Sequence, residues 1–491
     1  MDGRSVENRS WSVDLKLFIV NVSLDDLFGR IRSDYFAFTV ALAKYTEYYS
    51  VGNSSLNANY TAGTNVVNNL SALIVKKMQS SSDQVLTIVK KSHKAAEQLA
   101  TTSGLKRRHG VMTLAEAMES SFDEILEANT LDLEMSREMA VPEPIVDWLK
   151  LTPERLQTTV DILKQLTKSA DPTRRLINAP YQLGQSLTYC QLMPLGTIAL
   201  VYEGFPELGA IAAGMCLKTG NSLITRGCSA ASNSNQTITT ILQTALASID
   251  LPKGCLQAIS PDLGISVQEL VTQDRYLNLV IPYGRPSLVQ QVAEEATAPV
   301  LRTTMGNCYL YWAISGDLEM IRNIIVDSHN SEPDAVNALE KVLIHKNIKA
   351  SALQSLFNTL QEQGFRLRGD ATLVEQFPEY LKLMKSAEWR RPYLIKAVAF
   401  HYVDDLSQAV SWINRYSSGH ADCIVTESYQ ESRQFAQRID SALVYINTSP
   451  RFSRNPDGSE AVFLGMSNQK GYRQGLIGVE TFTTVKQIVQ G

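Results

Sequence analysis

A polar loop between a strand-like run and a helix-like run holds the residues best suited to bind an anion. Residues 222–225 are typical of a buried strand, and Arg226, Ser229, Asn233 and Asn235 follow where a helix opens near residue 232. Backbone N–H groups at a helix start can bind an anion, and arginine can hold a phosphate with two parallel hydrogen bonds. A plain strand-to-helix turn with a solvated arginine is the alternative. The glycine pattern GxGxxG of ordinary dinucleotide sites is absent.

The cysteines and histidines do not predict a metal site. Six cysteines are scattered without a CxxC pair, which favours reduced and mostly buried thiols. The six histidines lack the HExxH spacing of zinc enzymes. His345 and His420 stand alone, so each could be a general base or a hydrogen-bonded core histidine. We therefore expect no metal.

Length and composition predict a multidomain globular protein. The 491 residues suggest two or three compact units, and 44% are hydrophobic while 20% are charged. A net charge of -4 gives no reason to expect nucleic acid or an acidic membrane as partner. We find no apolar run long enough to span a membrane and no signal peptide, so we expect a cytoplasmic protein.

The hydrophobic pattern changes along the chain. Residues 1–80 are rich in Ser, Asn and Thr and predict a partly flexible appendage of unknown role. Residues 82–165 repeat apolar positions at helical spacing. From residue 192 short strands alternate with helices, which predicts an α/β fold with parallel sheets. The expected strands are 196–202, 222–225, 277–281, 393–403 and 421–426, and the expected helices include 208–217, 233–247 and 334–345.

Several ordered motifs carry a resemblance to a known family. They are Leu131-Asp132-Leu133, Val280-Ile281-Pro282-Tyr283-Gly284, Gly306-Asn307-Cys308, Asn337-Ala338-Leu339-Glu340 and Tyr416-Ser417-Ser418-Gly419-His420-Ala421-Asp422. Over residues 85–488 the chain resembles the gamma-glutamyl phosphate reductases, a branch of the aldehyde dehydrogenase superfamily. The family's usual Ser or Thr is replaced at Ala421.

The resemblance implies an architecture. It is an aldehyde dehydrogenase-like α/β fold with a Rossmann-type cofactor domain, an α/β catalytic domain and a small oligomerisation flap. The implied divisions are helices and cofactor domain at 81–298, catalytic domain at 299–440, and flap with C-terminal return segment at 441–491. The flap is expected near residues 440–448, in a homo-oligomer.

The resemblance also implies a reaction. Family enzymes reduce L-glutamyl 5-phosphate with NADPH to glutamate 5-semialdehyde in proline biosynthesis, through a cysteine that attacks the acyl carbon. The residues implied to bind NADP(H) are Lys218, Gly220, Asn221, Arg226, Ser229, Asn233 and Asn235.

The departures from the family concern the chemistry. Val336 stands before Asn337 where the family has its cysteine, and an isopropyl group cannot form a thioester. The loop Glu203-Gly204-Phe205-Pro206-Glu207 lacks a family arginine and gains a carboxylate, and Phe463 replaces a usual acidic residue. Glu203, Phe205 and the retained Arg451 are the expected substrate-side residues. Cys308 is expected to be structural rather than a substitute nucleophile.

Two hypotheses remain open. The chain is either a reductase of an acyl phosphate with an altered mechanism, or a catalytically impaired paralogue that keeps the fold and nucleotide binding as a regulatory or interaction protein.

Overall fold

The computed structural model describes residues 82–179, 181–330, 335–456, 458–471 and 475–491. The predicted appendage at residues 1–80 lies outside these ranges. No helix in the described ranges is both long and apolar enough to cross a bilayer.

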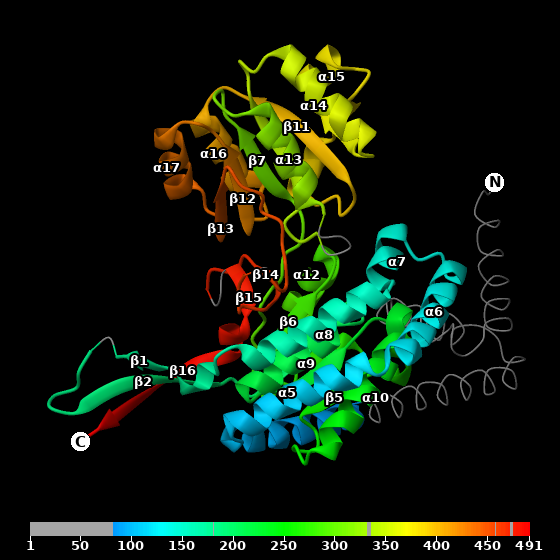
Figure 1. The fold of residues 1–491 in the computed structure, drawn as a ribbon, viewed down its shortest axis with the longest axis vertical. Coiled ribbons are helices and arrows are strands. Elements are labelled where there is room, and N and C mark those ends of the chain that lie inside the picture. Colours follow the sequence, from blue (N-terminus) through cyan, green and yellow to red (C-terminus); the bar gives the residue numbers. More distant parts are fainter. Residues whose placement is uncertain (1–81, 180, 331–334, 457, 472–474) are drawn as a thin grey trace, which may run out of the picture. The chain divides into compact units, whose positions relative to one another are not determined.

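Helices fill the first described part of the chain, as predicted (Figure 1). A helix over residues 82–101 comes first. It is followed by α5 (Gly104–Glu119), α6 (Phe122–Glu138), α7 (Glu143–Leu149) and α8 (Pro153–Lys168). The last of these helices is capped by Thr152, whose hydroxyl accepts the Arg155 N–H at 3.2 Å.

The first α/β block is built on a parallel sheet in the order β5-β4-β3-β6. Its strands are β3 (Thr197–Tyr202), β4 (Ser222–Arg226), β5 (Leu256–Ala258) and β6 (Leu279–Tyr283). Its helices are α9 (Leu208–Thr219), α10 (Ser232–Ser248), α11 (Val267–Val271) and α12 (Pro286–Glu295). Every residue of β3 and β6 is buried, which is typical of parallel strands covered on both faces.

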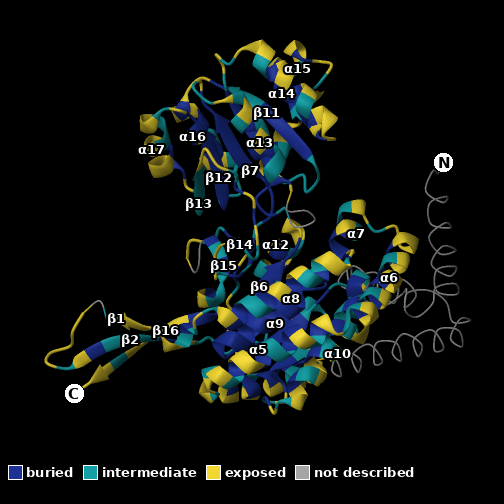
Figure 2. Ribbon diagram, viewed as in Figure 1, coloured by how far each residue is buried: buried dark blue, intermediate teal, exposed yellow. Residues whose placement is uncertain are grey.

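The second block is a seven-stranded parallel sheet in the order β10-β9-β11-β8-β7-β12-β13. Its strands are β7 (Cys308–Trp312), β8 (Leu339–His345), β9 (Arg366–Gly369), β10 (Lys382–Leu383), β11 (Ala397–Val403), β12 (Ala421–Val425) and β13 (Leu443–Ile446). Its helices are α13 (Leu318–Ser328), α14 (Ala350–Glu362), α15 (Ala371–Gln376), α16 (Leu406–Tyr416) and α17 (Tyr429–Arg438). The buried strands stand out as dark ribbons in Figure 2.

The predicted helix at residues 334–345 is wrong. Residues 339–345 form β8, which pairs with β7 and β11 and is buried along almost its whole length. A short apolar run cannot be assigned to helix or strand by periodicity alone. Hydrogen bonding of residues 339–345 to a strand on each side makes this segment a strand.

Antiparallel strands complete the fold. β1 (Leu176–Asn178), β2 (Leu187–Pro194) and β16 (Thr483–Gln490) form a three-stranded antiparallel sheet. All residues of its edge strand β1 and most residues of its other edge strand β16 are exposed (Figure 2). β14 (Phe463–Ser467) pairs with β15 (Gly475–Gly478). Short 3-10 helices lie at Pro172–Arg174, Ser229–Ala231, Pro261–Leu263, Ser386–Arg390 and Val479–Phe482.

The expected flap is displaced in the structure. Residues 443–446 form β13, the edge strand of the seven-stranded sheet, rather than an extended arm. The extended arm is instead the sheet of β1, β2 and β16, which joins two segments far apart in the sequence.

Candidate functional site

The residues predicted to bind the cofactor lie at opposite ends of β4. Arg226 ends this strand, and Ser229, Asn233 and Asn235 follow it. Lys218, Gly220 and Asn221 precede the strand. Ligands of open α/β sheets bind outside the carboxyl ends of the strands. The structure therefore corrects the grouping: only the residues from Arg226 onward lie at the edge that suits a dinucleotide.

The residues at the amino end of β4 have structural partners. The Lys218 Nζ donates to the Ser169 carbonyl at 2.5 Å, and burial lowers the pKa of this lysine. The Asn221 side chain accepts from the Gly196 N–H and donates to the Phe482 carbonyl, at 2.7 and 2.8 Å. Gly220 ends α9 with a φ of 83°, where a side chain is strained and would meet Arg107. These contacts hold elements together rather than face a ligand.

The amino-terminal N–H groups of α10 already bind a side-chain carboxylate of the protein itself. The buried Asp132 carboxylate accepts the backbone N–H groups of Asn233 and Ser234 at 3.0 and 2.7 Å. It also accepts the Ser234 hydroxyl at 2.6 Å and the Asn233 amide at 3.0 Å. The prediction of free N–H groups at this helix is therefore wrong, because a side chain of α6 satisfies them.

Other polar groups remain at the carboxyl edge of the sheet. Arg226 donates to the carbonyls of Gly227 at 2.6 Å and Ile265 at 3.2 Å, so backbone atoms orient its guanidinium. Tyr202 at the end of β3 donates its hydroxyl to Asn235 at 2.9 Å. An arginine at the carboxyl end of a strand in such a sheet can bind an anionic group of a nucleotide.

The loop after β3 is held by two ion pairs. Arg285 binds Glu203 with two nitrogens, one contact measuring 2.9 Å, and Arg155 binds both oxygens of Glu207 at 2.7 and 3.0 Å. Glu207 is 6% exposed. The carboxylate that this loop gains relative to the family is therefore paired with Arg155 inside the protein.

Phe205 is part of the core rather than a substrate contact. It is fully buried, stacks on Trp148 with ring centres 5.1 Å apart and meets Tyr283 edge-on at 5.7 Å. Its φ of 48° is unusual for a residue other than glycine. The Phe205 N–H donates to the Trp148 carbonyl at 2.9 Å, which fixes the loop despite that strain.

Val336, at the position of the family's nucleophile, is fully buried. It packs in a cluster, called here the Val336 cluster, whose members are Val336, Phe452, Met466, Leu443, Phe463 and Leu476. Phe463, which replaces an acidic residue, therefore contributes to the same apolar environment. Phe205 belongs to a different core cluster, so the departures do not form a single remodelled pocket.

The Asn337 side chain binds the backbone of the residue that precedes Arg451. The Asn337 Nδ2 donates to the Pro450 carbonyl at 2.8 Å, directly before Arg451. The Asn337 Oδ1 is buried without a partner in the described structure. Arg451 is half exposed and lies 3.4 Å from Asp327. Asn337 thus lies inside the site, while the Arg451 guanidinium remains accessible at its border.

His420 links Val336 to Cys308. Its Nε2 lies 3.0 Å from the Val336 carbonyl oxygen and 3.2 Å from the Cys308 Sγ, and its Nδ1 lies 2.8 Å from the Ser418 hydroxyl. A carbonyl only accepts, so Nε2 carries the proton and Nδ1 is the acceptor nitrogen that faces Ser418. The basic nitrogen consequently does not face the sulfur.

The pKa shifts agree with a neutral pair. Burial lowers the pKa of His420 to about 4. Burial and the nearby Asp422 raise the pKa of the Cys308 thiol well above its usual range. Because the thiolate is the nucleophile, Cys308 is not a substitute for the missing cysteine, as the sequence predicted.

His345 does not join the site. Its Nδ1 accepts the Asn347 N–H at 3.2 Å in the turn after β8. The described residues contain no cluster of three metal-ligating side chains.

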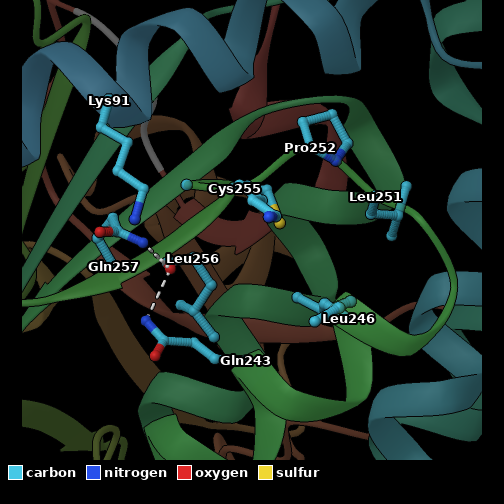
Figure 3. Close-up of a pocket in the computed structure, with 11 residues that line it drawn as sticks. Lys91, Gln243, Leu246, Leu251, Pro252, Cys255, Leu256 and Gln257 are labelled. Carbon is cyan, nitrogen blue, oxygen red and sulfur yellow. Dashed lines mark hydrogen bonds between the residues drawn. The ribbon is translucent and has the colours of Figure 1, made fainter.

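A cavity of about 290 Å³ lies at β5, and none of the predicted site residues lines it (Figure 3). Two glutamines, Gln243 and Gln257, both donate to the Leu256 carbonyl, at 3.0 and 2.6 Å. They cap a carbonyl of this edge strand, which accounts for their position.

Sequence reasoning missed the roles of Arg155 and Asp132. Asp132 stood in a motif of the resemblance, but the partners of Arg155 and Asp132 lie 52 and 101 residues away in the chain. Charged residues are rarely buried without a partner of opposite charge. A charged residue within a mainly apolar segment was therefore the sequence feature that could have indicated such a pair.

Comparisons with known proteins agree with this fold. The model of the aldehyde dehydrogenase family matches residues 59–365. The chain is 56% identical over 393 residues to "gamma-glutamyl phosphate reductase 2" of Synechocystis sp., covering 80% of this chain and 94% of that protein. It is 37% identical to gamma-glutamyl phosphate reductase of Gloeobacter violaceus, covering 79% and 92%.

Solved structures give the same result. The crystal structure of gamma-glutamyl phosphate reductase from Thermotoga maritima matches with a TM-score of 0.75 and 30% identity, covering 83% of this chain and 98% of that one. An acetylating aldehyde dehydrogenase from Geobacillus thermoglucosidasius shares the fold at a TM-score of 0.62 and 14% identity, covering 84% and 98%.

Proposed function

Because the chain belongs to the aldehyde dehydrogenase family and, within it, to the gamma-glutamyl phosphate reductases, we propose that it reduces L-glutamyl 5-phosphate to glutamate 5-semialdehyde. The observation that carries the proposal is the 56% identity to a protein of that name over 94% of its length. Proline biosynthesis is the corresponding pathway.

The proposed cofactor is NADPH, bound at the carboxyl edge of β3, β4 and β6. Arg226, Ser229, Asn233 and Asn235 are the residues proposed to line its site. The support is the guanidinium at the end of β4, which suits a 2′-phosphate. When bound, NADPH supplies the hydride.

Reduction of an acyl phosphate adds a hydride to the acyl carbon and breaks its bond to the phosphate oxygen. The electron pair of that bond leaves with phosphate, and an aldehyde remains. A thiolate normally divides this step in two. With Val336 in its place, the hydride must add directly, and loss of a catalytic nucleophile can cost a factor on the order of 10⁴ to 10⁶ in rate.

The buried Val336 is the reason to keep a second candidate function as a proposal. A fully buried valine in an apolar cluster and a neutral Cys308–His420 pair leave no nucleophilic thiolate here. The second proposal is an impaired paralogue that binds nucleotide and acts on a partner protein.

One assay separates the two candidates. Purified protein receives glutamate 5-semialdehyde, phosphate and NADP, and NADPH formation is followed by absorbance. The Val336→Cys variant is measured in parallel, and NADPH binding to both is titrated by fluorescence. Turnover by the unmodified chain supports the reductase, and turnover only by the variant supports the impaired paralogue. No NADPH binding at millimolar cofactor contradicts both.

The assembly is proposed to be a homo-oligomer in the cytoplasm. One face of the three-stranded sheet exposes Leu176, Leu187 and Met193, with Tyr189 and Ile488 partly buried beside them. Apolar residues on an open sheet favour contact with a second copy. The proposed divisions remain 81–298, 299–440 and 441–491, with the arm reassigned to β1, β2 and β16.

A further inference from the structure

The Val336 carbonyl, in the turn before β8, accepts hydrogen bonds from two other segments of the chain. The Gly306 N–H donates to it at 2.8 Å from the segment before β7, and His420 Nε2 lies at 3.0 Å from the segment before β12. His420 is fully buried. A carbonyl held from two sides cannot rotate without losing both bonds.

The ring of His420 is itself held in one tautomer. Ser418 lies 2.8 Å from Nδ1, and the Ser418 carbonyl accepts the Asn468 amide at 2.6 Å. A neutral imidazole has one donor and one acceptor nitrogen. Because the Val336 carbonyl can only accept, Nε2 carries the proton and donates to it, and Nδ1 is left as the acceptor nitrogen beside the Ser418 hydroxyl, which also lies 3.0 Å from the Gly306 carbonyl.

Fixing this carbonyl also fixes the next N–H group. The peptide bond is planar and trans, so the Asn337 N–H points opposite to the Val336 carbonyl. The Ala338 N–H closes a turn onto the Ala335 carbonyl at 3.1 Å. No acceptor for the Asn337 N–H is found among residues 335–456 or elsewhere in the described parts of the chain.

We propose that His420 is a positioning residue that, with Gly306, holds the peptide of Val336 and Asn337 so that the Asn337 N–H donates to the acyl oxygen of the substrate. This inference rests on the proposed reduction of an acyl phosphate. Negative charge develops on that oxygen when the hydride adds, and a donor already oriented stabilises it. The role does not depend on the side chain at position 336.

Two substitutions at His420 separate positioning from packing. His420→Gln retains an N–H donor near the place of Nε2, whereas His420→Leu retains volume without a donor. Both are made in the unmodified chain and in the Val336→Cys variant. His329→Leu is the matched control, because His329 is also buried and its Nε2 lies 3.2 Å from a strand carbonyl, that of Leu339.

The first measurement needs no turnover. Hydrogen exchange of the Gly306 amide is followed in the unmodified chain, and His420→Leu is expected to speed it at least about tenfold relative to His420→Gln. Equal exchange in the two variants overturns the proposal. NADPH titration of the same proteins tests the proposed function separately.

The second measurement is kinetic. In the Val336→Cys background, His420→Leu is expected to lower kcat at least about tenfold with KM for the aldehyde unchanged, and His420→Gln to stay within about threefold of its parent. A similar loss in His329→Leu at equal thermal stability identifies a packing effect and overturns the proposal. An inactive Val336→Cys parent counts against the proposed reaction, and hydrogen exchange then decides the role of His420.

Discussion

The guanidinium of Arg155 binds both carboxylate oxygens of Glu207, at 2.7 and 3.0 Å, and two further nitrogen contacts reach the carbonyls of Lys150 and Trp148. The pair connects the start of α8 to the loop after β3. Side-chain exposures of 14% and 8% show that both charges are largely removed from water. The Glu207 carboxylate therefore has a structural role, joining α8 to the loop after β3.

Removing one partner of this pair is expected to destabilise the protein. Arg155→Met leaves the buried Glu207 unpaired, which costs about 3–5 kcal/mol in the free energy of unfolding. The double variant Arg155→Met with Glu207→Leu is expected to recover most of that loss. Urea unfolding of the three proteins measures it, and an Arg155→Met variant as stable as the parent would disprove the role of the pair.

Two buried groups near Val336 are expected to give opposite pH dependences. The pKa of His420 falls from 6.5 to about 4 on burial, so the unfolded chain binds more protons between these values and stability rises with pH. The pKa of Asp422 rises from 3.8 to about 7 because burial outweighs the Ser441, Ser417 and Tyr309 donors. The folded chain binds that proton, and stability falls as pH rises through this window.

Replacing each residue is expected to remove its contribution to the pH dependence of the free energy of unfolding. Between pH 4.5 and 6, His420→Gln is expected to make the free energy of unfolding fall with rising pH relative to the parent, by about 1.4 kcal/mol per unit. Asp422→Asn is expected to change it by the same amount in the opposite sense. Urea unfolding at several pH values checks both, and parallel profiles for parent and variants would refute the assignment.

Cofactor preference is expected to depend on Arg226. Arg226→Gln removes the charge proposed to meet the 2′-phosphate and should weaken NADPH binding about tenfold while NADH binding changes little. Lys218→Met is the control, because Lys218 lies at the other end of β4. Fluorescence titration gives both dissociation constants. A larger effect of Lys218→Met than of Arg226→Gln would restore the grouping inferred from the sequence.

The state of assembly is expected to depend on the three-stranded sheet. Leu187 is 59% exposed, and Leu187→Lys with Met193→Lys places two charges on its apolar face. Light scattering after size exclusion should show a smaller species than the parent at the same concentration. Val485→Lys, on the opposite face by register with Leu192, serves as a comparison. Identical masses for all proteins would rule out this face as the contact.

The sequence by itself determined the family, the fold class and the absence of a thiol at position 336. These follow from residue identity and order, and from hydrophobic patterns that are local in the chain. The helical start, the alternating blocks and the buried state of Cys308 were all predictable in this way. The assignment of residues 334–345 to a helix failed because pairing with β7 and β11 is not local.

Only the tertiary structure decided which charged and polar groups meet. Asp132 fills the start of α10, Arg155 neutralises Glu207, and His420 holds the Val336 carbonyl. Lys218 and Arg226 are close in sequence, yet a strand separates them because an extended chain rises about 3.3 Å per residue. A hydrogen bond needs atoms within about 3 Å, and for residues far apart in the chain that distance is set by how the strands and helices pack.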